Sequence, residues 1–360
     1  FIVFNDWTYP NFIKLITELG VESQPTEMGF SVFDQEHNFE YAGTNLGTLF
    51  AQKRNLFSIN HWKMLRDIMR FNKEAIKDLD SGYLAPNESL GMYLRRKRYS
   101  EAFINRYLIP MGSAIWSATQ GAMLDFPLEF FIRFFKNHGL LNVVNRPQWR
   151  VIKGGSHAYI APLIKSFEDK IKLNSPVAKV LRTNAGVTVI SNGVAENFDH
   201  LILACHSDQA LALLGDPGDD EQAILGNISY QKNSVVLHTD ITLLPAIKST
   251  WSSWNYLLQA DNQQAPILTY SMNILQGINS STEFCVSLNA RHKIDPKKIL
   301  GEYEYSHPVF SPEAVQAQSA WSIINGKNNT WFCGAYWFNG FHEDGVNSAI
   351  RVVNALGVPV

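Results

Sequence analysis

The clearest hydrophobic pattern lies near the end of the chain. An apolar and aromatic run over residues 331–337 predicts a buried strand, and Asn339-Gly340 interrupts it with a turn signal. Asp344 stands where a helix N-cap is expected. Apolar residues then recur at helical spacing: Val346, Ala349, Ile350, Val353 and Leu356. Gly357 and Pro359 end the helix. The unit is a strand, a glycine-bearing loop and a helix N-terminus, whose unpaired N–H groups suit an anionic ligand.

The rest of the pattern divides the chain into helical and sheet-forming stretches. Helical spacing occupies residues 9–20 and most of 56–141. Short alternating runs predict strands within residues 21–50, four strands between 171 and 205, and an antiparallel sheet over 228–290. Breaks are predicted at Pro86, Pro110, Pro127 and the turns 184–186 and 192–193. This mixture predicts an α/β (α+β) fold, and 360 residues are enough for two domains with sizeable cores.

Aromatic side chains are concentrated between residues 109 and 149. Phenylalanines at helical spacing from Phe126 to Phe135 are interpreted first as core. The loop 138–149 places polar groups beside aromatics, a mixture typical of functional loops. The candidates for the wall of a substrate pocket are Trp116, His138, Trp149, Tyr159, Trp337 and Asn339. The three tryptophans each adjoin a loop or a glycine break, and we expect at least one of them to face the substrate cavity.

Composition excludes several other classes of protein. With 46% hydrophobic residues, 18% charged residues and a net charge of −2, the chain suits a soluble globular protein without affinity for nucleic acid. Three cysteines in apolar contexts predict reduced thiols in the cytoplasm. No metal site is expected, because the histidines show no metal-ligand spacing, and neither a G-x-S-x-G motif nor a P-loop occurs. No apolar run approaches a membrane span.

A basic run over residues 95–98 leaves contact with a phosphate, or peripheral contact with an anionic membrane surface, open as a further property. The interpretation we favour is a solvated helix face, because Tyr93, Leu94 and Phe103 supply the buried side of the same stretch.

Four segments resemble a known family. The pattern G-A-Y-W-x-x-G-F-H-E-D-G-V-x-S-A at residues 334–349 is similar to the C-terminal flavin-binding motif of the FAD-dependent amine oxidoreductase superfamily. That superfamily includes monoamine oxidases, protoporphyrinogen oxidase and phytoene-type desaturases. The segments IPMGSAIWS, NRPQWR and KGGSHAY are similar to a bacterial branch of it, known as predicted NAD/FAD-binding flavoproteins. The resemblance spans nearly the whole chain.

The resemblance implies FAD as the cofactor. In the superfamily the final helix points its N-terminus at the flavin pyrimidine carbonyl, where negative charge builds when the ring accepts a hydride. Adjacent glycines lie on the flavin side, and a Pro-Val pair lies near the adenosine. The implied cofactor-binding residues are Gly154, Gly155, Ser156, Val177, Gly334, Ala335, Asp344, Gly345 and Val346. The alternative is an ordinary strand, loop and helix in which Glu343 and Asp344 face solvent.

The superfamily fold is a Rossmann-like FAD-binding domain of the glutathione-reductase-2 type beside a helical and antiparallel-sheet substrate domain. The resemblance assigns residues 1–20, 147–215 and 322–360 to a discontinuous FAD-binding domain. Residues 21–146 and 216–321 form the expected substrate-binding domain.

One expected motif is absent from the chain. The FAD domain opens with G-x-G-x-x-G on a βαβ unit of about 30 residues. This chain starts at Phe1 inside a strand-like run, residues 1–5, and carries no such motif after a strand. We therefore expect the βαβ unit to precede Phe1, and we expect the 360-residue chain alone to hold FAD poorly and to be inactive. The alternative is a complete chain that binds no dinucleotide.

These observations favour an FAD-dependent oxidoreductase that removes a hydride from an amine or from an apolar substrate such as a fatty-acyl chain. No catalytic base is assigned, because hydride removal requires none. Two alternatives stay open: a non-catalytic binding or scaffold protein that keeps the flavoprotein fold, and an enzyme that binds NAD alone. The flavin-type C-terminal motif argues against the second.

Overall fold

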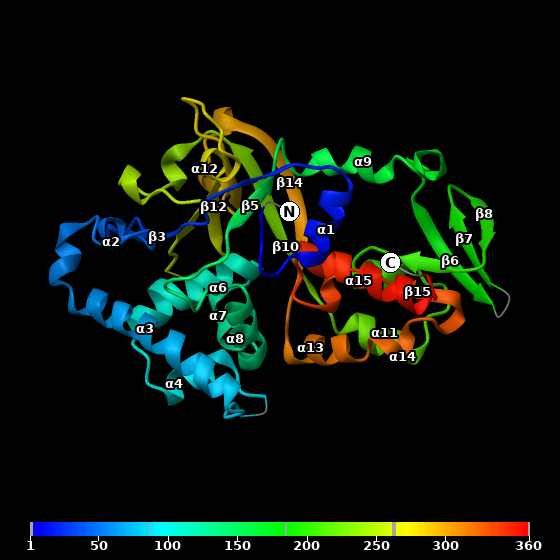
Figure 1. The fold of residues 1–360 in the computed structure, drawn as a ribbon, viewed down its shortest axis with the longest axis horizontal. Helices are drawn as coiled ribbons and strands as arrows, with labels where there is room; N and C mark the ends of the chain where they lie inside the picture. Colours follow the sequence, from blue (N-terminus) through cyan, green and yellow to red (C-terminus); the bar gives the residue numbers. More distant parts are fainter. Residues whose placement is uncertain (1–2, 86, 184–185, 261–263, 359–360) are drawn as a thin grey trace.

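The structure is a computed structural model that describes residues 3–85, 87–183, 186–260 and 264–358. The start of the predicted first strand, the Pro86 break, part of the 184–186 turn and Pro359 lie outside these residues. The described chain has the mixed α/β fold that the sequence predicts, with helices and sheets in separate layers (Figure 1).

A seven-stranded sheet forms one layer, in the order β14-β10-β13-β12-β11-β3-β4. Its strands are β3 (Phe30–Asp34), β4 (Phe39–Ala42), β10 (Tyr230–His238), β11 (Trp254–Leu257), β12 (Ile267–Ser271), β13 (Cys285–Leu288) and β14 (Ile299–Pro308). Neighbours are antiparallel except β11 and β3, which run parallel with Trp254 opposite Phe30. The antiparallel sheet predicted over residues 228–290 is confirmed, and β14 and two strands from the N-terminal region extend it.

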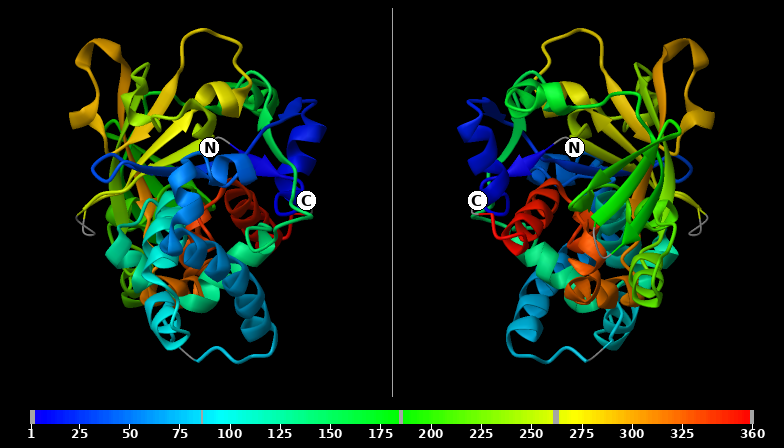
Figure 2. Two further views of the ribbon diagram at one scale, coloured as in Figure 1. Left: turned by 90° about the vertical axis from the view of Figure 1, so that its left-hand side faces the viewer. Right: turned by 90° about the vertical axis from the view of Figure 1, so that its right-hand side faces the viewer.

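A layer of helices packs against this sheet. In the turned views it lies below the yellow and orange strands of the sheet (Figure 2). The helices are α3 (Ile59–Asp80), α4 (Leu90–Arg96), α5 (Glu101–Phe103), α6 (Ile109–Trp116), α7 (Gln120–Leu124) and α8 (Leu128–Asn137). A π-helical turn, η2 (Ile104–Leu108), joins α5 to α6. Met64 and Ala114 share a buried cluster with Val32 and Tyr256 of the sheet. Phe131 and Phe135 lie in the helical core, as the interpretation of these phenylalanines predicted.

The other half of the molecule is built from smaller sheets. They are β1 (Phe4–Asn5), β5 (Trp149–Ile152) and β2 (Ser23–Pro25); β6 (Val177–Thr183), β7 (Gly186–Ser191) and β8 (Val194–Phe198); and the parallel pair β9 (Leu201–Leu203) and β15 (Thr330–Phe332). The helices of this half are α1 (Pro10–Glu18), α9 (Ile160–Ile164), α10 (Ser207–Leu213), α11 (Asp219–Gly226), α13 (Pro312–Ser319), α14 (Trp321–Ile324) and α15 (His342–Ala355). Two short helices, α2 (Leu46–Leu49) and α12 (Met272–Gln276), flank the large sheet.

Two local predictions near the C-terminus are wrong in detail. The strand predicted over residues 331–337 ends at Phe332, because its parallel partner β9 ends at Leu203 and the ladder stops where the Cys333 N–H donates to the Leu203 carbonyl. A 3₁₀ turn, Ala335–Trp337, follows. Asp344 is not the N-cap of α15, which begins at His342. Its carboxylate instead accepts the Phe341 N–H at 2.9 Å from the third helical position, so it caps the helix from inside.

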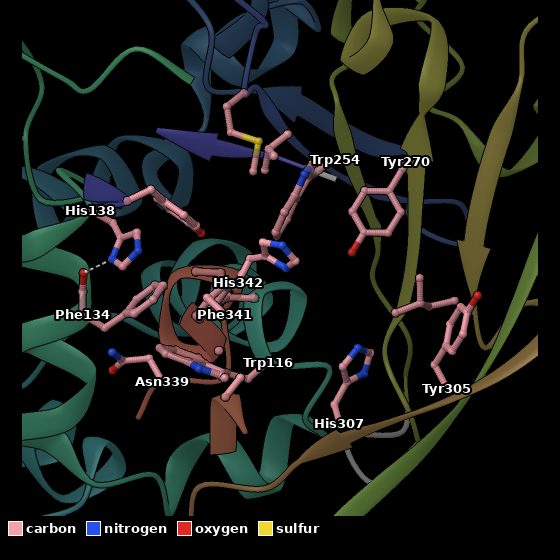
Figure 3. Close-up of a pocket in the computed structure, with 18 of the residues that line it drawn as sticks. Trp116, Phe134, His138, Trp254, Tyr270, Tyr305, His307, Asn339, Phe341 and His342 are labelled. Atoms are coloured by element: carbon pink, nitrogen blue, oxygen red, sulfur yellow. Dashed lines mark hydrogen bonds between the residues drawn. The ribbon is translucent and has the colours of Figure 1, made fainter. Parts of the chain in front are cut away.

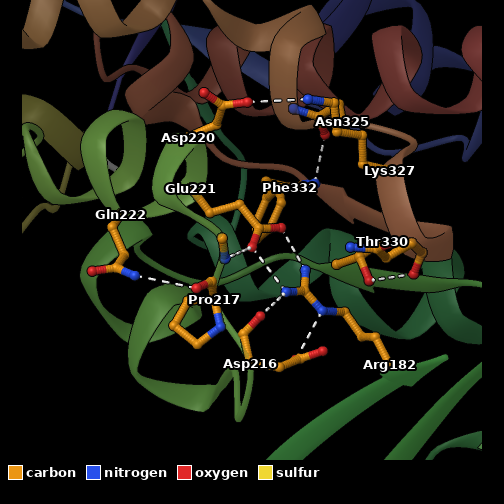
Figure 4. A network of polar contacts seen from close by, with 12 residues as sticks. Arg182, Asp216, Pro217, Asp220, Glu221, Gln222, Asn325, Lys327, Thr330 and Phe332 are labelled. Carbon is orange, nitrogen blue, oxygen red and sulfur yellow. Dashed lines mark hydrogen bonds and ion pairs between the residues drawn. The ribbon is translucent and has the colours of Figure 1, made fainter.

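A buried ion pair joins β6 to α11 (Figure 4). Both the Arg182 and the Glu221 side chains are almost fully buried, and the Arg182 Nη2 group donates to Glu221 Oε2 at 2.8 Å. The Nε group of Arg182 bonds Asp216 at 3.1 Å, and Glu221 also accepts the Gly218 N–H at 2.9 Å. If either charge is removed, the other stays buried, away from water, without a buried partner of opposite charge.

We expect Arg182→Met to lower the free energy of unfolding by about 3–5 kcal/mol, because Glu221 would stay buried and unpaired. The matched control is Glu304→Gln, which breaks the exposed Lys232–Glu304 pair and should cost about 0–1 kcal/mol. Urea denaturation measures both. Adding Glu221→Leu to Arg182→Met should recover most of the loss, and an equal cost for the two single substitutions would contradict this account.

Candidate active site

A cavity of about 1300 Å³ lies between the seven-stranded sheet, the helical layer and the start of α15. Its volume exceeds what one small ligand fills, so it has room for a cofactor ring together with a substrate. Figure 3 labels ten lining residues around this space: Trp116, Phe134, His138, Trp254, Tyr270, Tyr305, His307, Asn339, Phe341 and His342. The wall is mostly aromatic and aliphatic.

His138 is a neutral hydrogen-bond acceptor in the wall of this cavity. Its Nδ1 group donates to the Phe134 carbonyl at 3.0 Å, so the ring proton sits on Nδ1 and Nε2 keeps its lone pair. Burial lowers the pKa of His138 to about 4. The ring stacks on Phe134 with centroids 3.9 Å apart and lies 5.9 Å from the Phe341 ring. The imidazole is therefore fixed and uncharged near neutral pH.

His342, the first residue of α15, forms a second polar point with Tyr159. The Tyr159 hydroxyl and His342 Nε2 lie 3.1 Å apart, and both residues line the cavity. Phe12 of α1 packs edge-on against His342 at 4.7 Å. Burial lowers the pKa of His342 to about 4, so this histidine is also neutral. The pair can exchange a hydrogen bond but carries no fixed charge into the cavity.

His307 on β14 is held in the opposite tautomer from His138. Its Nδ1 lies 3.1 Å from the Asn233 amide nitrogen, which can only donate. The ring proton of neutral His307 is therefore on Nε2. Burial lowers the pKa of His307, so the cavity wall has a neutral donor on the sheet side and a neutral acceptor on the helical side.

The N-terminus of α15 is fixed by a carboxylate that reaches a second helix. The Glu343 side chain accepts the Asn11 N–H at 3.0 Å and the Phe12 N–H at 2.7 Å, which are first-turn groups of α1. Asn11 also donates to the Asn347 side chain at 2.7 Å. Both Glu343 and Asp344 are buried. The alternative in which these two acids face solvent is therefore wrong.

Two glycines at the site have different physical causes. A Cβ on Gly334 would come within 2.4 Å of the Tyr336 ring, so this position needs glycine for packing inside the protein. A Cβ on Gly345 would meet nothing within 4 Å, although Gly345 and Val346 line the cavity. The Tyr336 hydroxyl is buried and has no hydrogen-bond partner within the described chain. Open space at Gly345 and an unpaired buried hydroxyl are features of a site that receives a ligand.

The structure brings together most of the residues that the sequence singled out. Lining the cavity are Trp116, His138, Trp149, Tyr159, Asn339, Gly334, Ala335, Gly345 and Val346. Five do not line it: Gly154, Gly155, Ser156, Val177 and Asp344. Trp337 does not line it either, because the 3₁₀ turn directs its indole into the core, where Nε1 donates to the Phe332 carbonyl at 3.0 Å.

Several lining residues were not among the sequence candidates. Tyr107, Arg146, His307, Tyr336 and His342 come from a π-helical turn, a loop, a strand edge and two helix starts. His342 lies inside the G-F-H-E-D-G segment, so its position was a usable signal. Tyr336 lies in the same 334–349 pattern and Arg146 lies in NRPQWR, so the resemblance marked these two positions as well. For Tyr107 and His307 the signal is the tertiary approach of distant segments, which no local pattern carries.

The described ranges lack both a cluster of metal ligands and a membrane-spanning helix. They contain no group of three or more His, Cys, Asp or Glu side chains placed to hold a metal ion. Across the same residues, no helix is both long enough and apolar enough to cross a membrane.

Comparison with known proteins identifies the class. The sequence pattern of the flavin containing amine oxidoreductase family matches residues 1–266. Together with the fold and the cavity at a helix N-terminus, this match defines a flavoprotein oxidoreductase. The chain belongs to the flavin containing amine oxidoreductase family, so the expected resemblance is confirmed and the cofactor is FAD. No curated protein sequence matches the chain significantly.

Solved structures with the same fold act on different compounds. Cyclohexylamine oxidase from Brevibacterium oxydans IH-35A is 12% identical with a TM-score of 0.64, over 99% of this chain and 87% of that chain. A CLA-producing fatty acid isomerase from P. acnes is 12% identical with a TM-score of 0.66, over 99% and 86%. A UDP-galactopyranose mutase is 11% identical with a TM-score of 0.63, over 99% and 84%. At such identities the likeness establishes the fold alone.

We expect Asp344→Asn to change how stability depends on pH. Burial raises the pKa of Asp344 from 3.8 to about 6. Because the folded pKa lies above the unfolded value, the carboxyl contributes fully to stability below about pH 4, and this contribution is lost as pH rises through about 6. Asparagine keeps an acceptor for the Phe341 N–H without the charge. The variant should match the parent near pH 4 and exceed it at pH 7.5 by about 1–3 kcal/mol.

Thermal denaturation across this pH range measures the effect, and Asp169→Asn, on an exposed turn, is the control. A variant that loses stability relative to the parent as pH rises would show that the carboxylate charge is favourable where it sits.

We expect Gly345→Glu to bind FAD more weakly than the parent chain, whatever the parent's own affinity, because it fills the open space at the start of α15 and adds a negative charge where the flavin carbonyl is expected. Gly345→Ala is the control, since its Cβ meets nothing within 4 Å. Quenching of flavin fluorescence during titration gives both affinities relative to the parent chain. Equal FAD affinities for the two variants would show that the flavin does not bind beside the start of α15.

Proposed function

We propose that the protein oxidises a long apolar substrate with a carboxylate at one end, such as a fatty-acyl compound, and uses FAD as the acceptor. The observation that supports this is the distribution of charge around the cavity. Among the described lining residues, Arg146 is the single Lys or Arg and Glu27 the single Asp or Glu, and both are exposed at the mouth. The rest of the described wall carries no Lys, Arg, Asp or Glu, so it suits a hydrocarbon rather than a charged reacting group.

FAD, when bound, would supply a two-electron acceptor for a hydride, so that one C–H bond breaks and its electron pair leaves with the hydrogen. Oxidation of an acyl chain to a double bond also releases a proton from the neighbouring carbon, and Nε2 of neutral His138, which keeps its lone pair, would accept it. Gly345, Val346 and Ala335 are the residues that would hold its ring, and Tyr336 offers a buried hydroxyl. The protein contributes position and dryness. Trp116, Phe134 and Phe341 exclude water, and the neutral histidines leave no buried charge that would need solvation.

One helix face offers a path for a hydrocarbon chain. Tyr107, Met111 and Ile115 follow one another at four-residue spacing and all line the cavity. At 1.5 Å per residue they span about 12 Å. Tyr107 belongs to the π-helical turn, a distortion that is frequent at functional sites. The path leads from Tyr107 toward Trp116 and the ring cluster of Phe134, His138 and Phe341.

Arg146 supplies a partner for a carboxylate at the Tyr107 end of this path. Its Nε group donates to the Asn142 carbonyl at 2.7 Å, and its Nη groups make no hydrogen bond to any described residue. Burial raises the pKa of Tyr107, and the positive charge of Arg146 opposes that rise, so the guanidinium acts at the phenol. A guanidinium with free Nη donors beside a hydroxyl is suited to binding a carboxylate.

Three ligands with the same alkyl chain test the proposal: dodecanoate, dodecylamine and dodecanol. Quenching of tryptophan fluorescence measures their binding without a redox step. We expect dodecanoate to bind most tightly and Arg146→Met to weaken it about 10- to 100-fold while leaving dodecanol unchanged. Arg133→Met, which removes an exposed cation outside the cavity wall, is the control.

Anaerobic loss of the flavin absorbance on adding the bound acyl compound tests the oxidation itself. Tightest binding of dodecylamine, weakened by Glu27→Gln, would instead assign an amine substrate. In protein whose absorbance first shows bound FAD, binding of the acyl compound without any flavin reduction would favour the non-catalytic alternative.

A further inference from the structure

Large apolar side chains are exposed together at the tip formed by α2, the 3₁₀ turn η1 (Lys53–Phe57) and the start of α3, at the left-hand end of Figure 1. We call this surface the tip patch. Its apolar members and their exposed fractions are Phe57 at 88%, Leu46 at 75%, Ile59 at 73%, Trp62 at 51% and Leu56 at 45%. So many neighbouring exposed hydrophobic residues mark a surface that is covered in use.

The charged residues in the stretch that forms the tip patch are all positive. Residues 41–66 contain Lys53, Arg54, Lys63 and Arg66 and no Asp or Glu. Arg66 pairs with the buried Asp67 at 3.2 Å. Lys53, Arg54 and Lys63 are exposed and have no ion pair with any residue in the described ranges. Two acidic residues, Asp34 and Glu36, belong to the neighbouring β3–β4 turn. That turn contacts the tip through the Asn38 carbonyl, which accepts a hydrogen bond from the Gln52 side chain.

The start of α3 divides its residues between two faces. Met64, Phe71 and Ala75 point into the protein core, whereas Ile59, Trp62 and Arg66 lie on the opposite, exposed side. The tip is held in this shape by contacts of its own. Trp62 donates its indole N–H to the Leu56 carbonyl at 2.8 Å, and its ring packs on Phe50 with centroids 5.2 Å apart. The exposed apolar residues are therefore presented by a fixed surface.

The basic run at residues 95–98 differs from the tip patch. Arg96 bonds Glu88 at 2.8 Å and Lys97 bonds Asp78 at 2.6 Å, so two of its cations are engaged within the protein. Because α4 ends at Arg96, Arg95 and Arg96 lie on a helix face and Lys97 and Arg98 do not, so the predicted solvated helix face is correct for the first half of the run alone.

We propose that the tip patch docks the protein on the surface of an anionic lipid bilayer. Exposed Trp, Phe, Leu and Ile side chains insert among headgroups and acyl chains, while adjacent Lys and Arg side chains pair with anionic headgroups. The patch adjoins the cavity in sequence, because Gly43 and Thr44 line the cavity and Leu46 begins the patch. Docking would therefore bring the cavity close to a source of apolar molecules. The docking itself does not depend on the substrate or on FAD.

Co-sedimentation with vesicles tests the proposal. The probes are vesicles of phosphatidylcholine containing about a quarter phosphatidylglycerol, and vesicles of phosphatidylcholine alone. We expect strong binding to the anionic vesicles and weak binding to the neutral ones. Replacing three cations, Lys53→Gln, Arg54→Gln and Lys63→Gln, should lower partitioning on the order of 100-fold. Phe57→Gln with Ile59→Gln should lower it about tenfold or more on both vesicle types.

Matched controls replace equally exposed residues elsewhere: Lys165→Gln, Lys293→Gln and Lys297→Gln for charge, and Leu173→Gln with Val194→Gln for apolar area. These should bind like the parent. Because every substituted side chain is exposed, unchanged thermal denaturation separates loss of docking from loss of folding.

Absence of vesicle binding, or equal loss in the patch and control sets, would overturn the proposal. Sedimentation velocity covers the other occupant, a second copy of the chain. A dimer that Phe57→Gln converts to monomer, without vesicle binding, would assign the patch to self-association instead.

Discussion

The carboxylate of Glu343 sets the geometry of the site. It accepts two backbone N–H groups from the first turn of α1, although the two elements are more than 300 positions apart in sequence. Each helix N-terminus carries a partial positive charge of about half an elementary charge, so two of them pointing together would repel. The buried carboxylate of Glu343 offsets that repulsion, and Glu343 and Asp344 each satisfy backbone donors that have no partner inside a helix. The two acids are therefore structural.

The rest of the cavity wall follows from this clamp. With α15 held against α1, His342 reaches Tyr159 and packs on Phe12. Phe341, one residue earlier, stacks on Phe134 of α8 with centroids 4.9 Å apart. That contact ties the start of α15 to the helical layer, and His138 completes the same stack. A single helix start thus joins both halves of the molecule, which explains why loop, glycine and aromatic residues from distant segments meet there.

Local pattern predicted the elements well and their contacts less well. The helices of residues 56–141 and the strands of 228–290 follow from periodicity, because burial of one face is written into the spacing of apolar residues. The placement of Gly345 beside the cavity followed instead from the resemblance of residues 334–349 to a flavin-binding motif. Trp337 failed because the direction of its side chain depends on where the partner strand β9 ends, and pairing across more than a hundred residues leaves no local trace. The prediction that Asp344 is the N-cap was wrong because a carboxylate at the third helical position can make the same kind of capping contact as one at the N-cap.

The distribution of charge separates chemistry from delivery. Inside the cavity, burial lowers the pKa of His138, His307 and His342, so all three are neutral in the wall. A neutral wall neither stabilises nor repels a charged substrate, and it favours a reaction in which hydrogen leaves with its electron pair over one that needs a strong buried base. Among the described residues that line the cavity, the Lys, Arg, Asp and Glu side chains are Arg146 and Glu27, and both are exposed to solvent, as are the cations of the tip patch. This arrangement selects the polar end of a ligand at the mouth, where contact with water keeps the free-energy cost of a charge small. The apolar part of the ligand can move inward, because its burial carries no desolvation penalty.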